Sequence, residues 1–152
     1  MPKAEGPPRL QQMHAEAPSA DGSLTGAHYQ ALADFRHALR QFLAFSEEAA
    51  NGAGLTAQQH QALLSIRGAP GGAALGVNQL AGRLLISRDA AAELVDWLQQ
   101  AGLVSHGQNG DGRSRIVLTA KAEAILHSLS LAHMLELKAV RPIFHTLLRQ
   151  LD

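Results

Sequence analysis

Histidines are the residues of this sequence best suited to chemistry, because imidazole can bind a metal or change its charge near neutral pH. The 152-residue chain has no cysteine and eight histidines: His14, His28, His37, His60, His106, His127, His133 and His145. They form no HxH or HxxxH pair on one helix, so we expect surface or interface histidines and no metal site. His106 could make a pH-dependent contact with phosphate, but a solvated strand residue is the simpler expectation.

Patterns that would support catalysis are weak. The segment DGRS (111–114) holds a serine without a positioned histidine and acid, no glycine loop resembles a phosphate cradle, and the acids show no paired spacing. The lack of cysteine also removes a thiolate nucleophile, a disulfide scaffold and any cysteine-ligated metal site. We therefore expect no enzyme and no cofactor.

Two groups of residues could instead contact nucleic acid. A helix in the major groove places its N-terminal residues nearest the base edges, and an arginine-bearing hairpin tip reaches the backbone or the minor groove. The helix positions are Ser87, Arg88, Asp89 and Ala90, and the hairpin positions are Arg113 and Arg115. Thirteen basic and thirteen acidic residues cancel, so any attraction to phosphate must be local.

Apolar spacing predicts the helices that position these residues. A first helix runs from His28 to Ala50 and is stopped by NGAG (51–54), and a second (56–67) starts with Thr56 and Gln59 as a capping box. A third (77–85) turns Leu80, Leu84 and Leu85 inward, and Ser87 caps a fourth that ends near Gly102. Its apolar stripe is Ala91, Leu94, Val95 and Leu98. Two short helices joined by a tight turn indicate a helix-turn-helix.

After the fourth helix the period becomes strand-like. LVSH (103–106) and RIVL (115–118) flank GQNGDGRS, which favours a two-stranded hairpin. Thr119 can cap a fifth helix, and Pro142 fits the first turn of a sixth. The segment GAPGGAALG (68–76) is too rich in glycine to predict regular structure. The expected fold is mainly α, with six helices and a hairpin wing.

The first residues of the chain differ in composition from the helical part. Residues 1–26 are rich in proline and mixed charge, so we expect a mobile arm, or an arm laid over a dimer partner. No apolar run approaches the roughly 20 residues of a membrane span, and the first residues lack the apolar segment of a secretory signal. We expect a cytoplasmic protein without membrane contact.

The order of these segments, including LTAQQHQALLSI, VNQLAGRLLISRDAAAELVDWLQQAGLV and DGRSRIVLT, resembles the MarR family of winged helix-turn-helix regulators. The resemblance covers roughly 28–152 and implies one domain over 27–152, with a DNA-binding lobe at 55–119 and dimerisation helices at 27–50 and 120–152. It implies a homodimer that binds double-stranded DNA at a pseudo-palindromic operator. A repressor released by a small aromatic ligand is the usual form.

The resemblance also suggests roles for single residues. Asp96 and Asp111 match positions that orient the wing, with Asp96 holding Arg113. Asn78, Gln79 and Arg83 join the positions named above as candidates for DNA contacts. Ala92, Glu93 and Trp97 depart from the family pattern, which leaves the operator sequence open.

Aromatic residues give only weak evidence for a ligand pocket. Phe35, Phe42, His60 and Trp97 could line a ligand pocket, but aromatic residues at helical spacing more often pack in a core or a dimer interface. The alternative function is a winged-helix dimer that has lost DNA reading and acts as a ligand-binding or protein-interaction module. The departures at Ala92, Glu93 and Trp97 motivate that alternative.

Overall fold

The computed structural model describes residues 22–70, 75–108 and 114–152. These residues fall into two compact units, one formed by 22–39 with 140–152 and the other by 40–139. The long helices α1 (Gly26–Gly52) and α5 (Ala120–Arg149) contribute residues to both units. Residues 1–21 of the predicted N-terminal arm lie outside the described residues.

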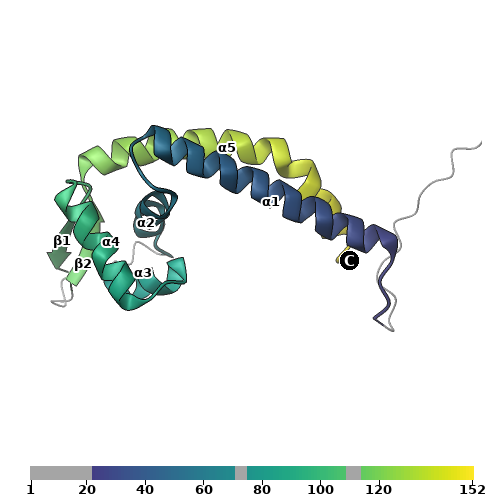
Figure 1. Cartoon of the computed structure of the whole chain (residues 1–152), viewed down its shortest axis with the longest axis horizontal. Helices are drawn as coiled ribbons and strands as arrows, with labels where there is room; N and C mark the ends of the chain where they lie inside the picture. Colours follow the sequence, from purple (N-terminus) through teal and green to yellow (C-terminus); the bar gives the residue numbers. More distant parts are fainter. Residues whose placement is uncertain (1–21, 71–74, 109–113) are drawn as a thin grey trace, which may run out of the picture. The chain divides into compact units, whose positions relative to one another are not determined.

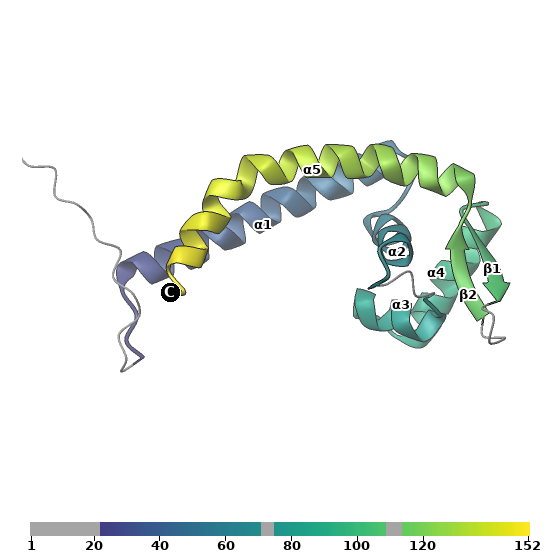
Figure 2. The same ribbon diagram turned by 180° about the vertical axis from the view of Figure 1, so that it is seen from behind.

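The larger unit holds the remaining elements. They are α2 (Ala57–Arg67), α3 (Val77–Leu84), α4 (Arg88–Gln100), β1 (Val104–Gln108) and β2 (Ser114–Leu118). Figure 1 shows α3 and α4 joined by a short turn, with the hairpin after α4, and Figure 2 shows the same elements from behind. The strands are antiparallel, and Val104 pairs with Leu118 and Gly107 with Arg115. This is the predicted mainly helical, winged helix-turn-helix fold.

Side-chain caps fix where the helices of this unit begin. Thr56 accepts the Gln59 N–H at 3.1 Å and Gln59 accepts the Thr56 N–H at 2.9 Å, so the capping box predicted for α2 is confirmed. Ser87 accepts the Ala90 N–H at 3.1 Å at the start of α4. Thr119 accepts the Ala122 N–H at 3.3 Å at the start of α5. Each cap satisfies an N–H group that the helix leaves unpaired.

An apolar core holds the larger unit together. Its most deeply buried large side chains include Leu63 of α2, Leu80 of α3, and Val95 and Leu98 of α4. Val104 and Ile116 add the inner face of the hairpin. The predicted α4 stripe of Ala91, Leu94, Val95 and Leu98 is buried throughout. The helix-turn-helix is therefore anchored by the apolar faces that the sequence spacing predicts.

The predicted break between a fifth and a sixth helix is wrong. The structure has one helix, α5, from Ala120 to Arg149 with Pro142 inside it, so the described residues contain five helices. Proline lacks an N–H and removes one helical bond, but its fixed φ is compatible with a helix. The boundary between the two units falls at 139 and 140, close to this proline.

The prediction that the Leu85 side chain faces the core is also wrong. Leu85 is 91% exposed and adopts a left-handed conformation, with φ 55°. The Ile86 N–H bonds to the Ala81 carbonyl at 3.1 Å and the Leu85 N–H to the Gly82 carbonyl at 3.4 Å. This is the helix-ending arrangement that glycine usually adopts, and it takes residue 85 off the helical face.

The glycine-rich segment before α3 contains more regular structure than expected. Leu75 is buried and forms an antiparallel bridge with Ile116, whose N–H donates to the Leu75 carbonyl at 3.1 Å. The hairpin is thus extended by one bridge on the free edge of β2. None of the described helices is long and apolar enough to cross a membrane.

Candidate nucleic-acid interface

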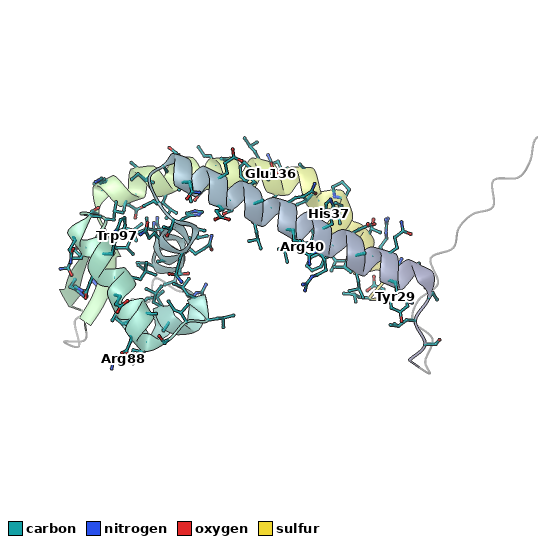
Figure 3. The ribbon with its side chains drawn as sticks, in the orientation of Figure 1. Tyr29, His37, Arg40, Arg88, Trp97 and Glu136 are labelled. Atoms are coloured by element: carbon teal, nitrogen blue, oxygen red, sulfur yellow. The ribbon has the colours of Figure 1, made fainter. Side chains whose placement is uncertain are left out.

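The start of α4 presents polar side chains to solvent. Ser87, Arg88 and Asp89 are exposed and Ala90 is half-buried. Figure 3 places Arg88 at the outer end of α4 and Trp97 near the other end of the same helix. The Ser87 oxygen is engaged as the helix cap, while its hydroxyl proton remains available to donate. The N-terminal end of α4 therefore combines free donors with the positive end of a helix dipole.

The second group of predicted contacts lies on α3. Asn78, Gln79 and Arg83 are all exposed. The Gln79 carboxamide oxygen accepts the Gly76 N–H at 3.0 Å, which completes the helix start and leaves its NH₂ group to donate elsewhere. Arg83 borders an open groove that it shares with Gln61 and Ser65 of α2. The α3 side chains can thus act as donors toward phosphate.

On the hairpin, Arg115 is exposed and lies on the strand face opposite the buried Ile116. A Cβ added to its strand partner Gly107 would meet the Arg115 Nε at 3.2 Å, so the arginine side chain lies across this glycine. Arg113 and Asp111 lie outside the described residues. The proposed contact from Asp96 to Arg113 therefore stays a prediction, and Asp96 itself is exposed.

The outer face of α4 is acidic, as the sequence indicated. Asp89, Glu93 and Asp96 are exposed, and none of them forms an ion pair with another described residue. Trp97 is 41% exposed, so part of its ring faces solvent beside these acids. Among the described residues of α3, α4 and the hairpin, the positive charges available to phosphate are Arg83, Arg88 and Arg115.

The residues proposed for a ligand pocket fall into separate places. Phe42 and His60 both contact His133 of α5, with ring centroids 5.7 and 4.9 Å from it. Phe35 belongs to the smaller unit and packs edge-on against Phe144 at 5.5 Å. An open groove of about 480 Å³ in the larger unit runs between the end of α1 and the first turns of α5, and none of the four predicted residues lines it.

Sequence reasoning missed a polar cluster around the half-buried His133. Its Nδ1 donates to the Leu129 carbonyl at 2.6 Å and its Nε2 bonds to the Ser46 hydroxyl at 2.7 Å. His60 faces it and is 1% exposed. Burial lowers the pKa of His60 below its ordinary value of 6.5, and the neighbouring His133 lowers it further. The sequence feature that could have revealed this cluster is the position of both histidines on apolar helix faces.

A helix-turn-helix whose apolar face is buried, followed by a two-stranded hairpin, is a winged-helix fold. Residues 53–114 match the model of the MarR family. Together with the fold and with the solved structures below, this match makes the chain similar to MarR-family transcriptional regulators. No curated protein is similar enough in sequence to count as a match.

Solved MarR-family structures share the fold. The multiple antibiotic-resistance repressor of Listeria monocytogenes is 26% identical, with 77% of this chain and 78% of that chain covered and a TM-score of 0.59. A MarR family protein from Bacillus stearothermophilus is 20% identical over 85% and 96% of the two chains, with a TM-score of 0.69. MepR, which regulates the Staphylococcus aureus multidrug efflux pump MepA, is 17% identical over 85% and 86%, with a TM-score of 0.59.

Proposed function

We propose that this protein is a homodimeric transcriptional repressor that binds a pseudo-palindromic DNA operator and is released by a small aromatic ligand. One observation carries the DNA-binding part of the proposal. The apolar face of α4 is anchored in the core, while Ser87, Arg88 and Asp89 at its N-terminus are exposed. A capped helix held in this way can insert its first turn into a major groove.

The donors around α4 suit a duplex. Arg88 would contact base edges or phosphate from the groove, and Asn78, Gln79 and Arg83 would position the lobe on the backbone. Arg115, extended across Gly107, would reach the flanking backbone or minor groove together with Arg113. Because the chain has no net positive charge, affinity must depend on these few local cations.

Dimerisation is supported by apolar side chains that the larger unit leaves in solvent on α5. Leu131, Met134 and Leu135 are 57%, 59% and 67% exposed. A contiguous exposed apolar surface on a helix usually marks an interface. Two copies related by a two-fold axis would place two α4 helices in successive major grooves, about 34–36 Å apart. The repressor role takes support from the Listeria relative, which is itself named a repressor.

Release by an aromatic ligand takes its support from aromatic and imidazole rings. Phe42 and His60 would provide apolar and polar contacts in the larger unit, and the half-exposed Trp97 offers a second stacking surface. A ligand can lower DNA affinity only if it binds better to the form that does not fit the operator.

Selection of bound fragments from random DNA tests the proposal directly. A pseudo-palindromic consensus should emerge, and repeating the selection with small phenolic or aromatic carboxylate compounds should reduce recovery. Arg88→Ala should weaken binding to the consensus and lower the log-log salt slope by about 0.9 for each phosphate that the arginine neutralises. Arg36→Ala, which removes an exposed arginine of α1 in the smaller unit, serves as the matched control. Recovery of no consensus at low salt contradicts DNA binding.

A second function is favoured by the exposed acids Asp89, Glu93 and Asp96 on α4. These carboxylates repel phosphate, and they suit a dimer that binds a ligand or a basic protein partner instead of DNA. The double substitution Arg113→Ala with Arg115→Ala separates the two functions. A DNA regulator must lose affinity for its operator, whereas an interaction module should keep its partner.

A further inference from the structure

We propose that the facing pair His60 and His133 makes the protein acid-sensitive, so that acid loosens α2 from α5 and weakens DNA binding. The pair joins α2, which packs against α3 and α4 of the helix-turn-helix, to α5, a helix of the proposed dimer region. This inference rests on the proposed DNA binding for its second step only. The loosening of α2 is a property of the free protein.

The geometry places two imidazoles together with no counter-charge. Their ring centroids are 4.9 Å apart, and Phe42 and Phe45 flank His133 at 5.7 and 5.3 Å. Two positive charges at this separation repel, the more so because His60 is buried. The pair is therefore stable only while at least one ring is neutral.

The hydrogen bonds of the pair also favour neutral rings. The Leu129 carbonyl can only accept, so His133 carries its proton on Nδ1 and its Nε2 accepts from the Ser46 hydroxyl. The Nδ1 atom of His60 is buried and has no hydrogen-bond partner among the described residues. A proton added at His60 Nδ1 would be a buried donor without an acceptor, and one added at His133 Nε2 would force the serine to turn.

No carboxylate of the described residues is placed to neutralise a protonated ring. In this part of the chain the only ion pair joins Arg67 to Glu123, at 3.0 Å. The other charged or titratable groups on the adjoining segments of α1 and α5 are Arg40, Glu47, Glu48, Lys121, His127, Glu136 and Lys138. Those on the elements that pack against α2 are Arg83, Arg88, Asp89, Glu93, Asp96 and Arg115. All are exposed except the half-buried Glu136, which forms no ion pair with either histidine.

The direction of the pH effect follows from the pKa of His60, which burial and then His133 lower from 6.5. The opened form binds a proton more readily than the closed form, so acid favours opening. If the opened imidazole titrates at 6.5, opening becomes more favourable by up to about tenfold between pH 7.5 and pH 5.5. The contribution of neutral His60 to the stability of the closed form is present above pH 6.5 and is lost as the pH falls below that value.

Hydrogen exchange of the α2 amides at pH 7.5 and pH 5.5 measures the first step. Protection factors, which remove the intrinsic pH dependence of exchange, should fall in the wild-type protein by up to about tenfold. They should change far less in His60→Phe, which keeps a ring of similar shape and removes the titrating group. If that variant folds poorly, an NMR titration of the wild-type imidazoles replaces it, and a His60 ring that titrates at or above 6.5 overturns the proposal.

Operator affinity measured at the same two pH values tests the second step. The wild type should lose up to about tenfold in affinity at pH 5.5, and His60→Phe should lose markedly less. His106→Gln is the matched control, because His106 is an exposed histidine on the hairpin and should leave the acid response intact. An acid response that disappears in His106→Gln and persists in His60→Phe overturns the proposal. Unchanged protection of the α2 amides at pH 5.5 also overturns the proposal, whether or not the protein binds DNA. Absence of DNA binding at every pH counts only against the proposed function.

Discussion

Replacing Leu85 with glycine should stabilise the protein. Leu85 is the one residue other than glycine with a positive φ among the described residues, at 55°. A left-handed conformation costs an L-residue about 1–2 kcal/mol, and glycine loses about 0.5–1 kcal/mol through its greater freedom in the unfolded chain. Because the leucine side chain is 91% exposed, its removal sacrifices little burial. The expected net gain is about 0.5–1 kcal/mol.

Urea unfolding and calorimetry at one fixed protein concentration would measure this gain. For a chain of this length it corresponds to a rise of about 1–4 °C in Tm. Leu85→Ala is the matched control, because alanine removes the same apolar atoms but keeps the Cβ that makes the conformation costly. Both backbone bonds that end α3, from Leu85 to Gly82 and from Ile86 to Ala81, are available to either variant. A glycine variant no more stable than the alanine variant would refute the strain assigned to residue 85.

Three further predictions concern the elements that hold the interface. Ser87→Ala removes the cap of α4 and should cost about 1 kcal/mol in urea unfolding, whereas Ser105→Ala, at an exposed strand position, should change the free energy of unfolding by less than about 0.5 kcal/mol. Leu98→Ala opens a cavity in the core and should lower the free energy of unfolding by about 2–5 kcal/mol, measured in the same way. Leu135→Glu places a charge in the proposed dimer surface and should yield a monomer by light scattering, and a dimer unchanged at micromolar concentration would contradict that assignment.

Much of the larger unit could be predicted from local signals. Thr56 and Ser87 are caps because a short polar side chain precedes an apolar stripe, and that rule needs no tertiary information. The buried stripe of α4 and the left-handed Gly102, which has φ 73°, can be predicted from local sequence in the same way. These features concern neighbours within one turn of helix, where sequence spacing determines contact.

The errors arise where a local signal has two outcomes. Pro142 fits either the start of a helix or an interior position that loses one bond, and neighbouring residues decide between them. Leu85 continues an apolar spacing, but the helix ends one residue earlier, so the side chain turns outward. The bridge from Leu75 to Ile116 depends on residues 41 positions apart, and short-range patterns carry no information about it.

The candidate site shows the same division. The exposed start of α4 follows from its cap and stripe, and the helix positions of Ser87, Arg88 and Asp89 were therefore predictable. The cluster of His60 with His133 was not, because it joins residues of α2 and α5 that are 73 positions apart. Each histidine interrupts an apolar face, which marks it as unusual, but only the fold brings the two together.

The most direct test of DNA binding through α4 is the salt dependence of operator affinity for wild type, Arg88→Ala and Arg36→Ala, measured by fluorescence anisotropy on a selected sequence. The wild type and Arg36→Ala should share one steep log-log slope. Arg88→Ala should bind more weakly, with a slope smaller by about 0.9 for each phosphate that Arg88 neutralises in the wild-type complex. Equal affinities and slopes for all three proteins, or no binding at low salt, would contradict DNA binding through α4.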